Sequence, residues 1–168
     1  MTRIGLISDT HGWLDEKVFD FFSNCDEIWH AGDIGDELYK SPSFGKLRMT
    51  KPFKAVYGNI DGQAVRSEFP EQLVFTCEEV KVMMRHIGGY PPKYNPATKK
   101  ELAIHKPQLF IDGHSHILKI MYDDKIDCLH MNPGAAGKQG WHKVRTIIRF
   151  AIDGKNIRDC EVIELGKR

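Results

Sequence analysis

The stretch RIGLISDTHGW (residues 3–13) passes from an apolar run directly into Asp9 and His11. The run RIGLIS is continuous rather than alternating in apolar character, which is typical of a strand buried on both faces. A helical pattern follows at residues 14–25, and DEIWH at residues 26–30 indicates a second short strand. Strand, helix and strand in this order predict that the chain opens with a βαβ unit.

Beyond residue 30, cap and turn signals predict the remaining elements. Asn95 followed by Pro96 is typical of a helix N-cap and first helical position, so a helix is expected over residues 95–106. The pair Asp153-Gly154 indicates a β-hairpin. Further strands are expected at residues 53–59, in two segments of 72–86, at 108–113, and in tightly linked segments within 117–131 and 144–165.

The order of these elements predicts the fold class. Helices lie mostly in the first two thirds of the chain, and strands joined by short turns fill the end. We therefore expect one domain over residues 1–168, an α/β fold arranged as a four-layer α/β/β/α sandwich, in which helices flank two facing mixed sheets.

Composition is that of an ordinary globular protein. Of 168 residues, 41% are hydrophobic and 28% are charged. No apolar run approaches the ~20 residues of a spanning helix and no signal peptide is recognisable, so no membrane partner and a cytoplasmic location are expected. The net charge of +1 provides no field that would attract long nucleic acid. The 4 cysteines form no Cys-x-x-Cys pair, which indicates reduced side chains rather than a disulfide or zinc framework.

Side chains able to bind a metal recur wherever a predicted strand ends. They are, in chain order, Asp9, His11, Asp33, Asn59, His86, His114 and His116. Strand ends form the rim at which open α/β sheets bind ligands, so these side chains are expected to form one site. Residues i and i+2 of an extended chain point the same way, so Asp9 and His11 would address one centre, as would His114 and His116. Gly58 is expected to let the backbone turn sharply beside a bulky ion, as is Gly113.

The number and chemistry of these donors indicate a binuclear site. Four imidazoles, two carboxylates and one amide are too many for one tetrahedral ion and suit two ions that share a carboxylate. Nitrogen and oxygen donors without a thiolate favour manganese, iron, zinc, cobalt or nickel over calcium or a cluster. We therefore expect two divalent metal ions per chain, with Mn²⁺ as the first choice.

Five motifs together resemble a known family. SDTHG, HAGD, YGN, a lone His86 and GHSH, in this order, are similar to the calcineurin-like metallophosphoesterase superfamily. The chain length and NPGAAG at residues 132–137 resemble its small bacterial and archaeal phosphodiesterase branch, to which the retromer scaffold subunit is also similar. The likeness runs from Arg3 to about Gly137. A single Asp-x-His pair carries little weight, whereas five motifs in order with Gly-His-x-His are specific.

The resemblance implies a role for each donor. One metal would be held by Asp9, His11 and His116, the other by Asn59, His86 and His114, with Asp33 as the bridge. It also implies a metal-dependent phosphoesterase that acts on a small phosphodiester substrate in preference to a monoester. A hydroxide held between the two ions would attack phosphorus in line.

The chain departs from the family pattern after Gly-Asn. Many members carry a histidine there that can act on the leaving group, whereas this chain has Ile60, which transfers no proton. Asp61 is the substitute candidate for a catalytic role, although an aspartate at such a position more commonly caps a turn. Substrates with good leaving groups are therefore expected to be preferred.

The segment GGYPPKYNP (residues 88–96) has no ready match in the family. Its glycines and prolines predict a hinged but stiff loop over the metals. Tyr94 would offer a ring face and Lys93 a cation to a ring-bearing phosphate ester, unless the tyrosine simply packs the loop onto the domain.

Two other functions remain open at this point. One is a metal-poor scaffold or binding protein on the same fold, which is disfavoured because no ligand position has been replaced. The other is a nuclease: the balanced charge disfavours one that acts on long nucleic acid, whereas a nuclease acting on short nucleic acid stays open. A homo-oligomer is compatible with the sequence.

Overall fold

The computed structural model describes residues 1–168, which form two five-stranded sheets and a two-stranded ribbon. The strands are β1 (Thr2–Ile7), β2 (Glu27–His30), β3 (Phe53–Ala55), β4 (Gln72–Cys77), β5 (Val80–Arg85), β6 (Gly89–Tyr90), β7 (Lys93–Tyr94), β8 (Leu109–Ile111), β9 (Leu118–Asp123), β10 (Cys128–Pro133), β11 (Val144–Asp153) and β12 (Asn156–Lys167). The helices are α1 (Lys17–Phe21), α2 (Asp36–Tyr39), α3 (Pro42–Met49), α4 (Gln63–Glu68) and α5 (Pro96–His105). None of the helices is long and apolar enough to cross a membrane.

Both large sheets are mixed. The first has the order β12-β11-β1-β2-β3, in which β1, β2 and β3 are parallel and β11 runs antiparallel to β1. The second has the order β4-β5-β8-β10-β9, with β5, β8 and β10 parallel and an antiparallel strand at each edge. Because the carboxyl ends of parallel strands meet at one edge, each sheet presents its strand-end loops together.

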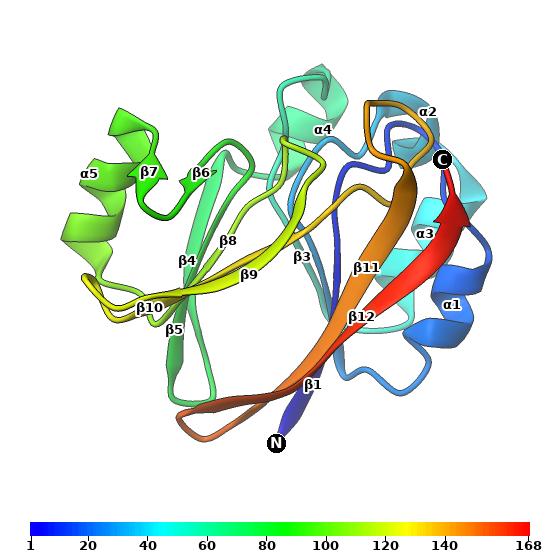
Figure 1. Ribbon diagram of the computed structural model, residues 1–168. Helices are drawn as coiled ribbons and strands as arrows, with labels where there is room; N and C mark the ends of the chain where they lie inside the picture. Colours follow the sequence, from blue (N-terminus) through cyan, green and yellow to red (C-terminus); the bar gives the residue numbers. More distant parts are fainter.

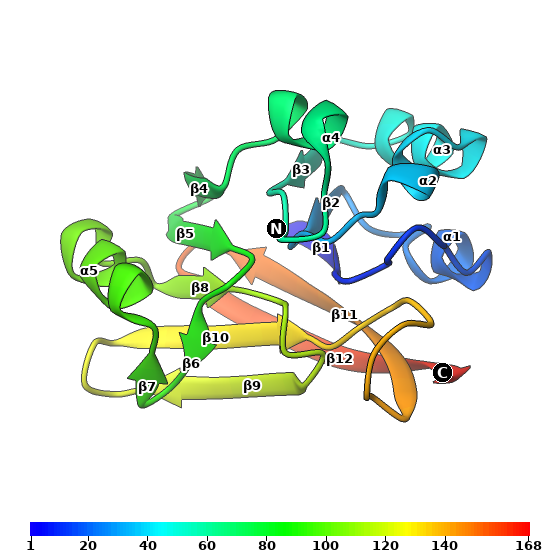
Figure 2. The same cartoon turned by 90° about the horizontal axis from the view of Figure 1, so that it is seen from above.

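The sheets and helices form layers (Figure 1), and three apolar clusters lie between these layers. The cluster between the sheets includes Leu6 and Trp29 of the first sheet and Met84 of the second. Another lies between the first sheet and α1 to α4, and a third lies under α5 on the far side of the second sheet. The order helices, sheet, sheet, helix confirms the predicted α/β/β/α sandwich, and Figure 2 shows α5 apart from the other helices.

Close packing of α1 on the first sheet depends on Gly5 in β1. A Cβ atom at Gly5 would lie 2.6 Å from the ring of Phe22, which is nearly completely buried. The absence of a side chain on this face of β1 therefore lets an aromatic ring approach the backbone directly.

Helices α2, α3 and α4 were not anticipated, and α1 is shorter than the predicted segment 14–25. Their short length leaves little periodicity to detect. The start of α3 nevertheless carries the same signal as α5, because Ser41 Oγ accepts the N–H of Phe44 and Pro42 occupies the first turn.

Candidate metal centre

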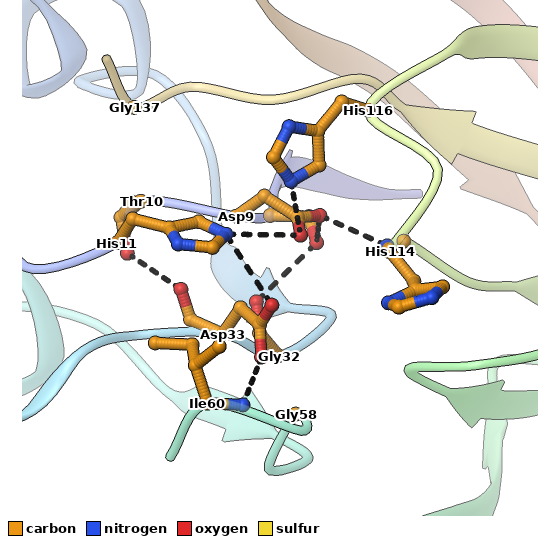
Figure 3. Close-up of polar contacts among 12 residues, drawn as sticks. Asp9, Thr10, His11, Gly32, Asp33, Gly58, Ile60, His114, His116 and Gly137 are labelled. Carbon is orange, nitrogen blue, oxygen red and sulfur yellow. Dashed lines mark hydrogen bonds and ion pairs between the residues drawn. The ribbon is translucent and has the colours of Figure 1, made fainter. Parts of the chain in front are cut away.

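The seven predicted donors come together at the edge where strand-end loops of both sheets meet. Asp9 and His11 follow β1, Asp33 follows β2, and Asn59 follows β3 of the first sheet. His86 follows β5, whereas His114 and His116 follow β8 of the second sheet. Figure 3 shows Asp9, Asp33, His11 and His116 pointing toward one another across this edge.

The donors form two groups of three in which the ligand atoms lie within 4.8 Å of one another. Asp9, His11 and His116 make the first group, and Asp33, His86 and His114 make the second. Asn59 lies beside the second group, with its Oδ1 2.9 Å from His114 Nδ1. Asp9 and the four histidines divide between the two groups as the family resemblance implies, while Asp33 falls within the second group.

Asp33 lies between the two groups. Its Oδ2 is 3.3 Å from Nε2 of His11 in the first group and 3.2 Å from Nε2 of His86 in the second. Its Oδ1 accepts the backbone N–H of Ile60 at 3.0 Å, which leaves Oδ2 directed at both imidazoles. This position fits a carboxylate shared by two cations.

Several ligand atoms are buried without a hydrogen-bond partner. They are Asp9 Oδ1, His11 Nε2 and His86 Nε2. The other oxygen of Asp9 accepts the hydroxyl of Ser8 at 2.6 Å and the N–H of His114 at 3.2 Å. The other ring nitrogen of His86 donates to the carbonyl of Ala31 at 2.7 Å, which leaves the Nε2 lone pair free. These atoms approach oppositely charged groups to within 3.1–3.3 Å without forming hydrogen bonds with them. Carboxylate and imidazole donors that converge in this way fit divalent cations.

Electrostatics within the site couple the carboxylates to the imidazoles. Burial alone would raise the pKa of Asp9, but His11 and His116 outweigh it and hold that pKa well below the ordinary value. Contact with Asp33, and then with Asp9, raises the pKa of His11 to about 9. The carboxylates thus draw protons onto the same nitrogens that a metal would occupy, so metal and proton compete.

Left-handed backbone, rather than extended chain, aims the paired donors. Asp9, His11, Asp33, His114 and His116 have φ angles of +53°, +48°, +55°, +70° and +60°. The i, i+2 argument from extended chain is therefore wrong, although the pairs do converge. Non-glycine residues rarely adopt such angles, and they gather at functional sites where the surrounding structure enforces them. Asp9 and His11 are fixed in this way because their N–H groups donate to the carbonyls of Gly32 and Asp33.

The chain does turn at Gly58, whose carbonyl accepts the N–H of Asp61 at 3.2 Å, but close approach is what requires a glycine there. A Cβ atom there would lie 2.0 Å from Asp33 Oδ1. A Cβ atom on Gly113 would likewise lie 2.7 Å from Asp9 Oδ2. Both glycines make room for a candidate ligand carboxylate, whereas neither has a positive φ.

The carboxylate of Asp61 is engaged by backbone N–H groups, as the turn-capping alternative expects. Its carboxylate is buried and accepts the N–H groups of Gly35 and Gly58 at 2.8 Å and of Ile34 at 3.3 Å. With both oxygens occupied in this way, Asp61 joins the loop that carries Asp33 to the loop that carries Asn59.

The loop at residues 88–96 does not place Tyr94 and Lys93 over the donors. It forms the β6–β7 ribbon, beside α5 and β9 (Figure 2). The ring of Tyr94 packs 6.0 Å from that of Phe110, and its hydroxyl donates to Asp123 at 2.7 Å. Since both ends of Tyr94 are engaged on the outer face of the second sheet, the predicted stacking role is wrong and the packing alternative holds. Lys93 is exposed on the same ribbon.

Two supporting residues of the site were missed or only partly foreseen. His30 is fully buried, accepts the N–H of Gly32 at 3.1 Å and lies 3.1 Å from the hydroxyl of Thr10. Burial lowers its pKa to about 3, so it is neutral. Ser8 was missed altogether, although its place directly before Asp9 is a readable signal.

Comparisons with known proteins agree with this geometry. Residues 2–155 match the calcineurin-like phosphoesterase superfamily domain. A probable metallophosphoesterase of Methanothermobacter thermautotrophicus is 29% identical over 97% of this chain and 92% of its own length. Another, from Methanocaldococcus jannaschii, is 32% identical over 79% of this chain and 67% of its own length.

Solved structures share the fold at lower identity. A Vps29 single mutant from Entamoeba histolytica superposes with a TM-score of 0.74 at 15% identity, covering 98% of this chain and 99% of that one. An archaeal phosphodiesterase superposes with a TM-score of 0.72 at 24% identity, covering 97% and 99%. From its sequence motifs, its donor geometry and these matches, the chain belongs to the calcineurin-like phosphoesterase superfamily.

Proposed function

We propose that the protein is a phosphodiesterase that works with two divalent metal ions, manganese by preference. The observation that supports this proposal best is the set of buried donor atoms, free of hydrogen bonds, that converge in two groups around Asp33. Further support comes from the family match and from the similarity in fold to an archaeal phosphodiesterase.

The chain's own residues would position the metals and the substrate. Two bound cations would lower the pKa of water and neutralise charge on the phosphoryl oxygens. His86 is held by Ala31 in the tautomer that keeps Nε2 free, and Ser8 with the His114 N–H turns Asp9 Oδ1 inward. Asp33 then contributes negative charge to both groups at once.

The leaving group is expected to depart without a protonated side chain at position 60. The side chain of Ile60 lies at the rim near His11, in a shallow pocket that Gln139 also lines. A hydrocarbon cannot transfer a proton, so diesters with acidic leaving alcohols should react fastest. A metal-poor scaffold receives less support, because all seven donor positions are kept and converge.

The decisive experiment measures metal content and hydrolysis together. Protein loaded with Mn²⁺ should contain two ions per chain and should hydrolyse bis(p-nitrophenyl) phosphate faster than p-nitrophenyl phosphate. Asp33→Asn should reduce the rate at least about a hundredfold, because the shared carboxylate loses its charge. Asp153→Asn, on the distant β11–β12 turn, is the matched control. One ion or none per chain, or a fully active Asp33→Asn variant, would overturn the proposal.

A further inference from the structure

A groove of about 580 Å³ begins at the second group of donors. Asn59 and His86 line it together with Arg66 of α4 and residues 95–97 at the start of α5. An ester group bound at the metal centre would therefore extend into this groove. This reasoning rests on the phosphodiesterase function proposed above.

Two arginines line the groove, and Arg66 of α4 is the more firmly fixed. Its Nε donates to the carbonyl of Asp61 at 2.6 Å, and its Nη2 donates to the carbonyls of Asn59 at 3.2 Å and Gly58 at 3.5 Å. The guanidinium also covers the ring of Tyr57, 4.5 Å from its centroid. Its hydrogen bonds thus go only to neutral carbonyls, so its charge is not neutralised and its Nη1 edge is free to donate.

Arg85, the last residue of β5, lies next to His86 in the chain. Its Nη1 donates to Gln72 at 3.0 Å, while its Nη2 reaches the carboxylate of Glu71 at only 3.4 Å. The side chain of Arg85 is 16% exposed, whereas that of Glu71 is 62% exposed and extends into solvent. The lining of the groove therefore holds two guanidiniums against one loosely attached carboxylate.

The same lining argues against a groove built for a ring. Only 3 of its 11 residues are hydrophobic, and Arg66 already covers a face of its one aromatic side chain, Tyr57. A guanidinium can bind phosphate through two parallel hydrogen bonds. Arg66 has a free Nη1 for this, whereas Arg85 would exchange its long contact with the exposed Glu71 for the phosphate. Charge, and not stacking, is thus the chemistry that this groove offers.

We propose that the groove binds a second phosphate, carried on an alcohol substituent of the phosphodiester substrate. Arg85 is its specificity-determining residue. Arg66 contributes charge and also positions the Asn59 loop. The preferred substrate class is accordingly a phosphodiester that carries an additional phosphomonoester.

Two substrates that differ only in this phosphate test the inference. They are thymidine 5′-(p-nitrophenyl phosphate) and its 3′-phosphorylated counterpart, which release the same leaving group. Arg85→Gln should lower kcat/KM about tenfold for the 3′-phosphorylated substrate, mainly through KM, and less than about twofold for the other. Arg85→Lys should recover part of the loss because it keeps the charge. Arg158→Gln, on exposed β12, is the matched control.

Binding provides a readout that does not depend on turnover. Calorimetry should show thymidine 3′,5′-bisphosphate binding more tightly than thymidine 5′-phosphate to the wild-type protein, with the difference lost in Arg85→Gln. If neither nitrophenyl ester is hydrolysed, the proposed function fails, and the calorimetric difference still decides the role of the groove. If both esters are hydrolysed and Arg85→Gln affects them equally, the groove inference is wrong while the function stands.

Discussion

Asp61 holds two donor-bearing loops in place from beneath the site. An asparagine there would offer one oxygen instead of two and would turn an N–H₂ group toward backbone N–H donors. We expect Asp61→Asn to lower the free energy of unfolding by about 2 kcal/mol, because a buried donor loses its acceptor. Urea denaturation measures this change, with Asp153→Asn as the exposed control.

The activity of the same variant separates a structural role from a catalytic one. Folded Asp61→Asn saturated with Mn²⁺ should keep most of its kcat, unlike Asp33→Asn. A normal unfolding free energy combined with a loss of rate as large as that of Asp33→Asn would return Asp61 to the catalytic residues.

His11 makes the stability of the metal-free protein depend on pH. Its pKa rises from 6.5 to about 9 in the folded protein, chiefly through Asp33 and then Asp9. A folded-state pKa above the unfolded one gives stability that is complete below pH 6.5 and is lost as the pH rises through about 9. EDTA-treated protein should therefore show a Tm that falls across this window, and His11→Gln should flatten the fall. A Tm that rises across the same window would contradict this assignment of charge.

At the scale of elements, the β6–β7 ribbon is a packing device on the outer face of the second sheet. Tyr94→Phe removes the hydroxyl that donates to Asp123 and should lower the free energy of unfolding by about 1.5 kcal/mol. The variant's kcat/KM should be unchanged. Tyr90→Phe is the matched control, since Tyr90 is 39% exposed and lies under the ammonium of Lys119. A lower kcat/KM in Tyr94→Phe without a loss of stability would show that the ribbon takes part in substrate binding.

At the scale of the whole molecule, the candidate metal centre joins the two sheets. Asp9, His11, Asp33 and Asn59 come from the first sheet, whereas His86, His114 and His116 come from the second. Metal bound only by the folded state should add about 2.7 kcal/mol of stability at a free concentration one hundred times its Kd. Scanning fluorimetry should show a higher Tm with Mn²⁺ and a lower one with EDTA, and a smaller response in Asp33→Asn. A Tm that changes with neither Mn²⁺ nor EDTA would show that no metal joins the sheets.

Local signals account for what the sequence predicted correctly. The buried run before Asp9, the Asn95-Pro96 helix start and the Asp153-Gly154 turn each depend on residues close together in the chain. The metal-donor residues at the ends of the strands can also be recognised from the neighbouring sequence alone. Since side-chain chemistry and short-range periodicity are written in the sequence itself, these features, and through them the sandwich, could be predicted.

The placement of side chains across the fold depended on contacts between distant residues. The His114 N–H reaches Asp9 across 105 residues, and the hydroxyl of Tyr94 finds Asp123 across 29. In the sequence, Asp61 resembles an ordinary turn residue. Only the folded structure shows that its carboxylate accepts the N–H of Gly35, 26 residues away. Sequence alone therefore determined which groups were available for chemistry, whereas the order of strands and the packing of the sheets decided which of them face one another, because burial and hydrogen bonding are set by neighbours in space.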